Sequence, residues 1–353
     1  MTVSANALRA AVPARYYIEL PRLLGRHGIN AAEVWDAAGI SPTLLNDPEA
    51  QLSLEELERL VSALMGIGGR DLPLELGRSI RLRNHALVGY AMLSSPTVDY
   101  AMRLTSRFFR LVFPAFRMQY RVTPQGAEMR FLPTLAMSSD CLAFHIEMLA
   151  VAALTDVQEL IQGALPHYDL ELSIPAPLHR DRYHQLMPQA RLHFAALPHP
   201  GLCLRLPTSI LGEEPAMANA ASLAVAEQRC RQLVDHIVSS GNIGAWTRMM
   251  LRESNDGLPS IEELAATLNI NSRTLHRHLK REGLVYRQLC VEERSNRARQ
   301  LLAGSRLSIT RIAQELGYSD ASNFTRAFRA AVGCSPSDYR AEYGVADSLS
   351  TQN

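Results

Sequence analysis

Two stretches near the C-terminal end carry polar and basic side chains at the spacing of one helix face. In the first stretch, four such residues fall within about 80° of arc if the segment is helical: Arg273, His276, Arg277 and Lys280. In the second stretch, the matching positions hold Ser322, Thr325, Arg326 and Arg329. An arginine guanidinium can bind both O6 and N7 of guanine, and short hydroxyl side chains bond to several base edges. Both faces therefore have the chemistry needed to read bases in a DNA groove.

Both stretches belong to an internal repeat. The segment Ser260–Leu268 aligns with the segment Ser308–Leu316, and each begins with a serine, which favours a helix N-cap. Glu263 adds a capping box to the first copy. Apolar residues then recur at i, i+3, i+4 and i+7, the spacing of a helix with one buried face. After a short turn the apolar residues of the second helices also match: Leu275 with Phe324, and Leu279 with Phe328.

A short helix, a tight turn and a second helix with a cationic outer face form the layout of a helix-turn-helix unit. In such units the second helix lies in the DNA major groove, and its outward side chains reach the base edges. The alternative is an ordinary helical hairpin whose polar side chains contact only water. Repetition of the pattern in register favours the DNA-reading interpretation.

One long helix is expected between the two units, over Arg287–Leu302, ending at Gly304. Its 16 residues would span roughly 24 Å, at 1.5 Å per residue. Such a rod could hold the two units about one DNA turn apart, roughly 34 Å. After Gly333, we expect Ser335 and Pro336 to begin a last short helix.

Composition indicates a globular protein with an anionic partner. The 353 residues suffice for about two domains, and 47% of them are hydrophobic and 20% charged. The segment Leu258–Val345 holds 13 Arg and Lys against 9 Asp and Glu, hence +4. The remainder holds 23 basic and 26 acidic residues, hence −3. The modestly basic C-terminal part favours an anionic partner, and chance is the alternative explanation for a difference of four charges.

The cysteines and the apolar runs predict neither a cofactor nor a membrane span. The five cysteines are widely spaced and form no Cys-x-x-Cys pair, so we expect no disulfide framework, metal site or other cofactor. The longest apolar run, Cys141–Leu154, is too short to cross a bilayer. The first residues lack the apolar core of a secretory signal. We expect a cytoplasmic protein with no membrane partner.

The N-terminal part, residues 1–211, predicts an α+β domain with helices around a small antiparallel sheet. We expect a capping box between Ser53 and Glu56. The expected helices cover Ala14–Arg26, Ala31–Ala38, Leu54–Leu64, Thr97–Val112 and Asp140–Gln162. The expected strands cover Phe116–Val122, Ala127–Leu132, Tyr168–Ile174, Arg191–Phe194 and Leu202–Leu206.

Residues 212–241 are expected to form a linker helix, mainly over Ala216–Val238. Its apolar stripe has spacings of three and four residues, which suits a short dimer seam: Leu223, Ala226, Cys230, Leu233 and Ile237. The alternative is a connector helix packed on its own domain. We expect an all-α DNA-binding domain over residues 242–343 and a disordered tail over 344–353.

The C-terminal part resembles the AraC/XylS family of bacterial transcription regulators. The resemblance rests on SRTLHRHLKREG (Ser272–Gly283) and on IAQELGYSDASNFTRAFRAAVGCSPSDYR (Ile312–Arg340). The second string follows the long C-terminal signature of that family. It implies two helix-turn-helix units joined by a helix, which bind promoter DNA and recruit RNA polymerase. Two positions differ from many relatives: Arg273 stands where a large residue such as Trp is common, and Ala321 where a polar residue is common.

Residues for DNA contact follow from the helix faces and from this resemblance. The family's base-contacting positions correspond here to Arg273, His276, Arg277, Ser322, Asn323 and Arg326. Together with the remaining polar residues of the two faces, the predicted DNA-binding set is Ser272, Arg273, His276, Arg277, Lys280, Ser322, Asn323, Thr325, Arg326 and Arg329.

The N-terminal part resembles the effector-binding domain of the ornithine-regulator-like branch of the same family. The stretch GYAMLSSPTVDYAMRLTSRF (Gly89–Phe108) carries this resemblance. It implies an arabinose-binding-type domain that senses a small molecule and forms a homodimer. Candidate effector contacts are polar residues within apolar stretches, although such residues are often ordinary hydrogen-bonded side chains: Arg107, Arg110, Tyr120 and His145.

Three function classes remain from the sequence. A ligand-responsive transcription regulator accounts for both parts of the chain. An enzyme fused to a DNA-binding tail would need a catalytic motif, and the sequence contains no G-x-S-x-G, H-E-x-x-H or P-loop. A purely architectural DNA-binding protein would bind without sequence preference, which two base-reading faces disfavour.

Overall fold

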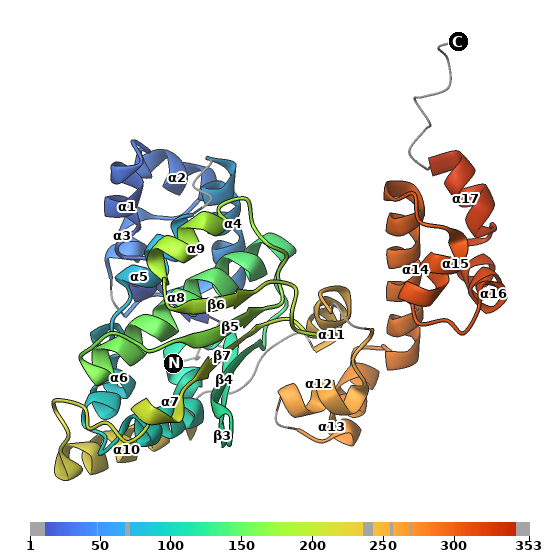
Figure 1. Cartoon of the computed structure of the whole chain (residues 1–353). Coiled ribbons are helices and arrows are strands. Elements are labelled where there is room, and N and C mark those ends of the chain that lie inside the picture. The colour runs from blue at the N-terminus through green and yellow to red at the C-terminus, as the bar shows by residue number, and fades with distance from the viewer. Residues whose placement is uncertain are drawn as a thin grey trace, which may run out of the picture. The chain divides into compact units, whose positions relative to one another are not determined.

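The computed structural model describes residues 11–47, 49–67, 71–235, 243–254, 257–268 and 270–343. The chain forms two units, Met1–Asn242 and Ile243–Asn353 (Figure 1). The expected tail over residues 344–353 lies outside the described residues.

The first half of the N-terminal unit is mainly helical. Its elements are β1 (Ala11–Pro13), α1 (Leu20–Arg26), α2 (Ala31–Ala38), α3 (Pro42–Asn46), β2 (Gln51–Ser53), α4 (Leu54–Gly66), α5 (Leu72–Ser79), α6 (Ala86–Leu93) and α7 (Val98–Val112), with 3-10 turns at Ala14–Tyr16 and Leu82–His85. The capping box of Ser53 and Glu56 opens α4 as predicted. The prediction of a single helix over Ala14–Arg26 was wrong about where the helix begins, since α1 begins at Leu20. Pro21 stands in its first turn, where proline is tolerated, whereas within a helix it would break the hydrogen-bond ladder.

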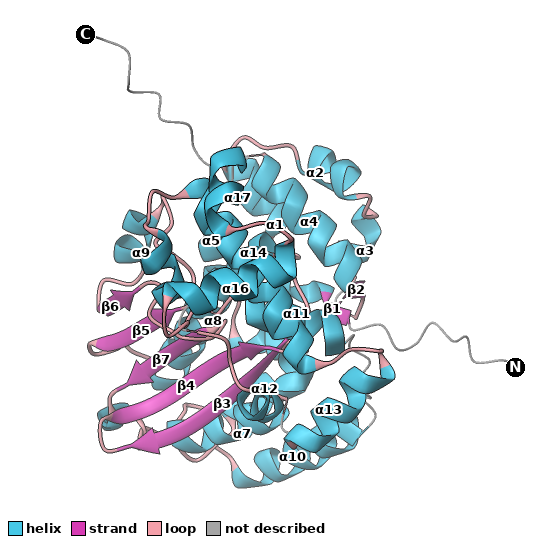
Figure 2. Ribbon diagram, turned by 90° about the vertical axis from the view of Figure 1, so that its right-hand side faces the viewer, coloured by secondary structure: helices cyan, strands magenta, loops and turns pink. Residues whose placement is uncertain are grey.

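A five-stranded sheet forms the second half of this unit. Its elements are β3 (Phe116–Thr123), β4 (Gly126–Pro133), α8 (Ser139–Ile161), β5 (Tyr168–Leu172), α9 (Arg180–Leu186), β6 (Ala190–His193) and β7 (Leu202–Leu206). The strand order β3-β4-β7-β5-β6 can be followed in Figure 2. The predicted α+β class is confirmed, but the sheet is not wholly antiparallel, because β6 pairs with β5 in parallel. The crossover through α9 returns the chain in the same direction, and a parallel pair requires such a connection.

The two faces of the sheet differ in chemistry. Met118, Met129 and Phe131 are buried on the face toward α7 and α8. The opposite face carries a charge network in which Glu128 accepts hydrogen bonds from Arg121 and Arg205. Burial by itself would raise the pKa of Glu128, but these two hydrogen bonds hold it below its usual range. The apolar face is therefore the core of the unit.

Helix α5 packs directly on the long helix α8. A side-chain carbon at Gly77 would lie 2.3 Å from the carbonyl oxygen of Met148, a distance that no real contact tolerates. Glycine at this position lets the two backbones approach. Because α8 also packs against α4 and α7, it forms the central rod of the helical layer.

Helix α10 (Ala220–Asp235) packs against α6 and α7. Leu223 and Cys230 of the predicted stripe are buried inside this chain's own N-terminal unit, so they are not free to form a seam with a second copy. Leu233 is exposed. Ile237 lies outside the described residues. The packing corresponds to a connector helix on its own domain.

The C-terminal unit is all-helical in its described residues. Its helices are α11 (Ile243–Arg252), α12 (Ile261–Thr267), α13 (Ser272–Arg281), α14 (Tyr286–Gly304), α15 (Ile309–Glu315), α16 (Ala321–Val332) and α17 (Pro336–Tyr343). Ser335 and Asp338 cap the last helix, and Gly333 takes a positive φ of 93° after α16, which favours glycine. None of the described helices in either unit is both long enough and apolar enough to cross a lipid bilayer.

Candidate nucleic-acid interface and ligand pocket

The first helix-turn-helix unit consists of α12 and α13. The predicted capping box of Ser260 and Glu263 opens α12, and the side chain of Asn271 caps α13 by accepting from the backbone N–H of Thr274 at 2.8 Å. Leu275 and Leu279 are buried. On the other side of α13, Ser272 is half-buried, and the four basic residues of the predicted face are exposed: Arg273, His276, Arg277 and Lys280.

The second unit consists of α15 and α16. Ser308 caps α15, and Asp320 caps α16 by accepting from the backbone N–H of Asn323 at 2.7 Å. The inner side of α16 is buried through Phe324 and Phe328. The outer side exposes three residues of the predicted face: Ser322, Arg326 and Arg329. The offset between the two copies therefore positions equivalent side chains on equivalent helix faces.

Two residues of the predicted DNA-binding set in α16 already form hydrogen bonds within the chain. The hydroxyl of Thr325 donates to the carbonyl oxygen of Ala321 at 2.8 Å. The amide nitrogen of Asn323 donates to Ser319 and Asp320, while its oxygen accepts from Arg326. Asn323 therefore connects the N-cap of the helix to the guanidinium of Arg326.

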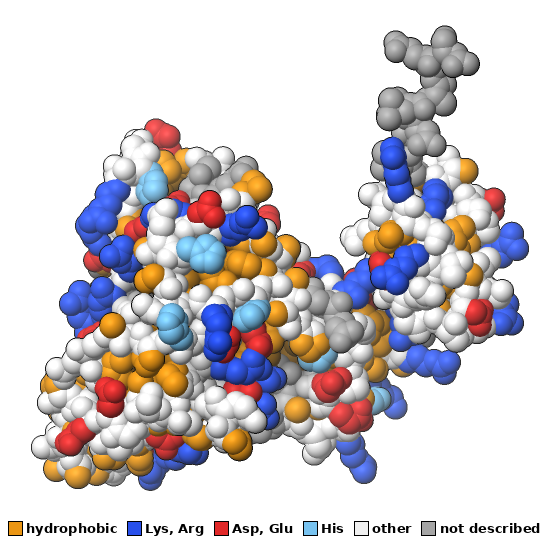
Figure 3. All heavy atoms as spheres, viewed as in Figure 1, with side chains coloured by type: hydrophobic (Ala, Val, Ile, Leu, Met, Phe, Trp, Pro, Cys, Tyr) orange, Lys and Arg blue, Asp and Glu red, His pale blue; other side chains and the backbone are white. Residues whose placement is uncertain are grey.

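The long helix α14 joins the two helix-turn-helix units as predicted, and it has 19 residues instead of the 16 expected. At 1.5 Å per residue its length is about 28 Å. Ala298 and Leu302 of α14 belong to the core of the second helix-turn-helix unit, together with Phe324, Phe328 and the partly buried Tyr339. Helix α14 also contacts α11, which packs on α13. Figure 3 shows lysine and arginine side chains projecting at several places from the C-terminal unit.

The four residues predicted to bind an effector do not share a pocket. Arg107 is exposed and lies 3.9 Å from Glu227 of α10. Arg110 is exposed on α7. The hydroxyl of Tyr120 donates to Asp99 at 2.8 Å. Their roles in the structure are contacts between elements or at the surface.

His145, the fourth of these residues, is fully buried in α8. Its Nδ1 donates to the carbonyl oxygen of Cys141 at 2.6 Å, and its Nε2 accepts from the hydroxyl of Tyr17 at 2.7 Å. Burial lowers the pKa of His145 to about 4, so the ring is neutral at pH 7. Both nitrogens are satisfied within the core, and nothing is left for a ligand.

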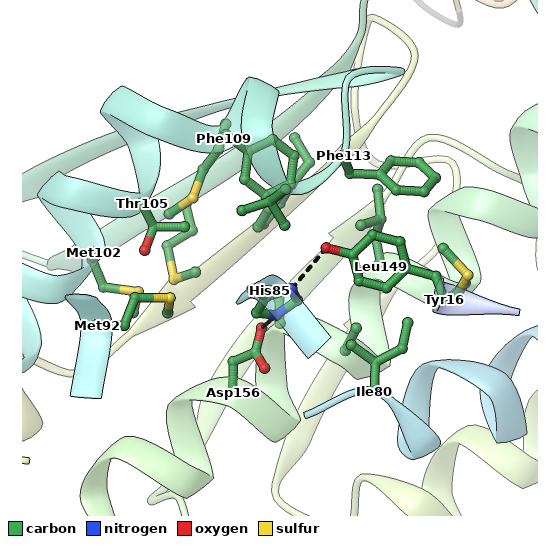
Figure 4. Close-up of a pocket in the computed structure, with 17 residues that line it drawn as sticks. Tyr16, Ile80, His85, Met92, Met102, Thr105, Phe109, Phe113, Leu149 and Asp156 are labelled. Atoms are coloured by element: carbon green, nitrogen blue, oxygen red, sulfur yellow. Dashed lines mark hydrogen bonds and ion pairs between the residues drawn. The ribbon is translucent and has the colours of Figure 1, made fainter. Parts of the chain in front are cut away.

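A cavity of about 30 Å³ lies between the apolar face of the sheet and helices α6, α7 and α8 (Figure 4). Five of the chain's twelve methionines line it: Met92, Met102, Met118, Met129 and Met148. Three phenylalanines complete most of the apolar wall: Phe109, Phe113 and Phe131. A cavity needs about 10–15 Å³ to hold one water molecule, so this cavity has room for little more than water. Methionine side chains are flexible, and such a wall can open for a larger molecule.

The wall of this cavity has a single cluster of charged and polar groups. The hydroxyl of Tyr16 lies 3.0 Å from Nδ1 of His85, and Nε2 of His85 lies 2.7 Å from Oδ2 of Asp156. Figure 4 shows Tyr16 and Asp156 on opposite sides of the imidazole. The second oxygen of the carboxylate, Oδ1, is buried and has no hydrogen-bond partner among the described residues. An unpaired buried carboxylate oxygen is costly unless something else binds it.

Sequence reasoning missed this cluster. Tyr16, His85 and Asp156 stand about 70 residues apart in the chain and come from three different elements. One local signal exists, because Met148, Ala152 and Asp156 recur every four residues along α8 and so share one face. That spacing identifies a buried face but does not reveal that the face borders a cavity.

Comparisons with known proteins agree with this architecture. Residues 28–203 match the family described as the arabinose-binding domain of AraC transcription regulators, N-terminal. Residues 264–342 match a helix-turn-helix domain family. The two matches thus fall on the N-terminal unit and on the C-terminal unit, respectively.

Relatives of similar length carry both parts. The chain is 29% identical over 337 residues to the ornithine utilization regulator of Pseudomonas aeruginosa, covering 95% of this chain and 98% of that protein. It is 24% identical to an uncharacterized HTH-type transcriptional regulator of Mycobacterium tuberculosis, covering 91% and 93%. Among solved structures, the transcriptional regulator CdpR from Pseudomonas aeruginosa is 26% identical, with a TM-score of 0.47 over 93% of this chain and 98% of that one.

Proposed function

Because the chain is an AraC-type transcription regulator, we propose that it reads promoter DNA through α13 and α16 under the control of a small molecule bound in the methionine-lined cavity. One observation carries the DNA-reading part of this proposal. In both copies of the repeat, a buried apolar pair fixes the inner side of the second helix while arginines stand exposed on the outer side.

The joining helix supports the use of two grooves by one chain. Helix α14 is about 28 Å long and contributes to the core of the second unit, so it is a rigid connection. We propose that α13 and α16 enter successive major grooves, which are about 34 Å apart. Phosphate contacts from the remaining arginines would set the register of the complex.

A route from the cavity to the linker helix supports effector control. Met92 of α6 and Met102, Thr105 and Phe109 of α7 line the cavity, and α10 packs on the same two helices. The buried Glu227 of α10 accepts a hydrogen bond from Tyr100 of α7 at 2.8 Å. A ligand that displaces α6 or α7 would therefore act on α10, the last described helix before the DNA-binding unit.

We also propose that the protein acts in the cytoplasm as a homodimer, together with RNA polymerase. The inner side of α10 is occupied, so a second copy would contact its exposed residues, including Val225 and Leu233. We propose a binding protein and not an enzyme, since the relatives matched along the whole chain are named as regulators.

Selection of genomic DNA fragments by the purified full-length protein tests the proposal. We expect an enriched motif of two short half-sites about one helical turn apart. The full-length Arg277→Ala protein should lose base preference at one position of one half-site and keep the other half-site unchanged. Enrichment without any motif would contradict base reading and favour the architectural alternative, whereas turnover of a bound metabolite would favour an enzyme.

A further inference from the structure

We propose that the cavity binds a small apolar amine, whose ammonium group donates a hydrogen bond to Oδ1 of Asp156 while its hydrocarbon part lies among the methionines. The inference deepens the proposed function, because it assigns a ligand class to the same cavity. Its evidence is the chemistry of the wall and does not depend on DNA binding.

The charged groups among the lining residues favour a ligand with a positive charge. Among the 17 lining residues, Asp156 is the only carboxylate, His85 is the only histidine, and no arginine or lysine is present. A ligand carboxylate would lie near Asp156 without a fixed cation to offset the repulsion. A ligand ammonium would instead pair with Asp156 in a site that excludes most water.

The hydrogen bonds of the cluster select a donor. With a neutral imidazole, Nε2–H of His85 donates to Oδ2 of Asp156, and Nδ1 accepts the hydroxyl hydrogen of Tyr16. Every side-chain N–H and O–H donor among the lining residues is then used, and so is one oxygen of the Asp156 carboxylate. Only Oδ1 remains, and as an acceptor it requires a donor from outside the chain. The hydroxyl of Thr105 cannot supply one, because it donates to the carbonyl oxygen of Ala101 at 2.7 Å.

The apolar part of the wall selects the rest of the molecule. Methionine sulfur contacts aromatic rings favourably, and the phenylalanines offer edge-to-face partners. Phe109 and Phe131 already pack edge to face, with ring centroids 5.3 Å apart. A molecule about the size of one ring with a short aminoalkyl chain would bring its ammonium group to Oδ1 and move the methionine side chains apart.

Isothermal titration of the full-length protein without DNA tests the inference. Three probes share one ring and differ in one end: 2-phenylethylamine, 2-phenylethanol and phenylacetate. At pH 7.5 we expect the amine to bind at least tenfold more tightly than the carboxylate, with the alcohol between them. Equal binding of all three, stronger binding of phenylacetate, or no binding by the amine would overturn the proposal.

Variants locate the binding within the cavity. Asp156→Asn should weaken amine binding at least tenfold and change alcohol binding by less than about threefold, because it removes the charge and keeps the shape. Asp181→Asn, an exposed carboxylate on α9, is the matched control and should change neither. Unchanged amine affinity in folded Asp156→Asn would contradict the assignment. If this variant does not fold, the comparison of three probes on the unmodified chain still decides.

The two proposals fail in different ways. Amine binding that leaves DNA affinity unchanged would support the ligand class and contradict effector control. Control of DNA binding by a compound that does not compete with the amine would locate the effector elsewhere. L-ornithine is a useful added probe, because a relative regulates its utilization. Its carboxylate lacks a cationic partner in this cavity, so we expect it to bind more weakly than the simple amine.

Discussion

Arg326 is oriented before any DNA is present, because Asn323 accepts from its guanidinium and is itself bonded to the N-cap Asp320. Arg277 occupies an exposed position on α13, where the chain offers the same guanidinium chemistry. An arginine that binds a guanine with two hydrogen bonds contributes to both affinity and discrimination. A single residue of each reading helix can therefore be tested for base reading.

The first prediction concerns these two arginines. Arg277→Ala and Arg326→Ala should each lower affinity for the selected site by about 1–3 kcal/mol and relax specificity at one base pair. Fluorescence anisotropy with the selected site and its single-base variants measures both effects. Arg22→Ala, an exposed arginine of the N-terminal unit, is the control and should change neither. An equal loss on every sequence would instead make the residue a phosphate contact.

The second prediction concerns the buried His145. Its folded pKa of about 4 lies below the unfolded value of about 6.5, so below that value the unfolded chain binds a proton that the folded chain does not. Its contribution is therefore constant above about pH 6.5 and is lost as the pH falls toward 4. Through this residue alone, the free energy of unfolding of the N-terminal unit should fall by about 2 kcal/mol between pH 7.5 and pH 5.

Urea unfolding at these two pH values measures that loss. His145→Gln removes the titrating group, so the difference between the two pH values should shrink by about the same 2 kcal/mol. His184→Gln, at an exposed position on α9, should leave the difference unchanged. If the pH dependence of His145→Gln equalled that of the unmodified chain, the neutral buried imidazole would be disproved.

At the scale of elements, α10 is held to its own unit by a polar contact as well as by apolar packing. Tyr100 of α7 and Arg231 of α10 both donate to the buried Glu227. A buried carboxylate that loses a hydrogen-bond donor keeps its desolvation cost. Removal of the Tyr100 hydroxyl alone should therefore weaken the attachment of α10 to α7. If a ligand displaces α7 as proposed, the contact between Tyr100 and Glu227 would transmit that displacement to α10.

The third prediction tests the anchor. Tyr100→Phe should destabilise the N-terminal unit by about 1–3 kcal/mol and weaken the effect of a bound ligand on DNA affinity, while leaving ligand affinity nearly unchanged. Urea unfolding and anisotropy titrations with and without ligand measure these quantities. Tyr90→Phe, on the exposed part of α6, is the control. A full ligand response in Tyr100→Phe would exclude this contact from the route.

At the scale of the whole molecule, two reading helices on one chain make spacing and salt decisive. If α13 and α16 both bind DNA as proposed, the joining helix α14 would raise the effective concentration of the second half-site once the first is bound. Inserting about five base pairs between half-sites turns the second one to the opposite face of the DNA. The more phosphate contacts the two helix-turn-helix units make together, the more steeply the DNA affinity falls with salt concentration.

The fourth prediction follows from that arrangement. Affinity for the selected site should fall at least about a hundredfold between about 50 and 200 mM salt. It should also fall at least about tenfold when about five base pairs are inserted, approaching the affinity for one half-site. Gel-shift titrations over a salt series and a spacing series measure both. A spacing series without any effect would mean that only one unit reads DNA at a time.

Local patterns in the sequence determined most of the C-terminal unit. Serine caps, apolar spacing and the repeat predicted α12, α13, α15 and α16, because a helix-turn-helix forms from contacts between residues close in the chain. The same patterns predicted which side of each reading helix is exposed. They did not show that Asn323 forms a hydrogen bond with Ser319 or Thr325 with Ala321, because these contacts depend on side-chain rotamers.

In the N-terminal unit, the sequence predicted most helices and strands but neither their pairing nor the cavity. The parallel pairing of β5 with β6 depends on where the crossover α9 directs the chain. His145 has the same residue type as His85, yet the first is a satisfied core residue and the second borders the cavity. Tyr16, His85 and Asp156 meet only when three distant segments pack together. Local spacing carries no information about contacts between segments so far apart in the chain, so only the tertiary structure decided where the cavity lies and which residues line it.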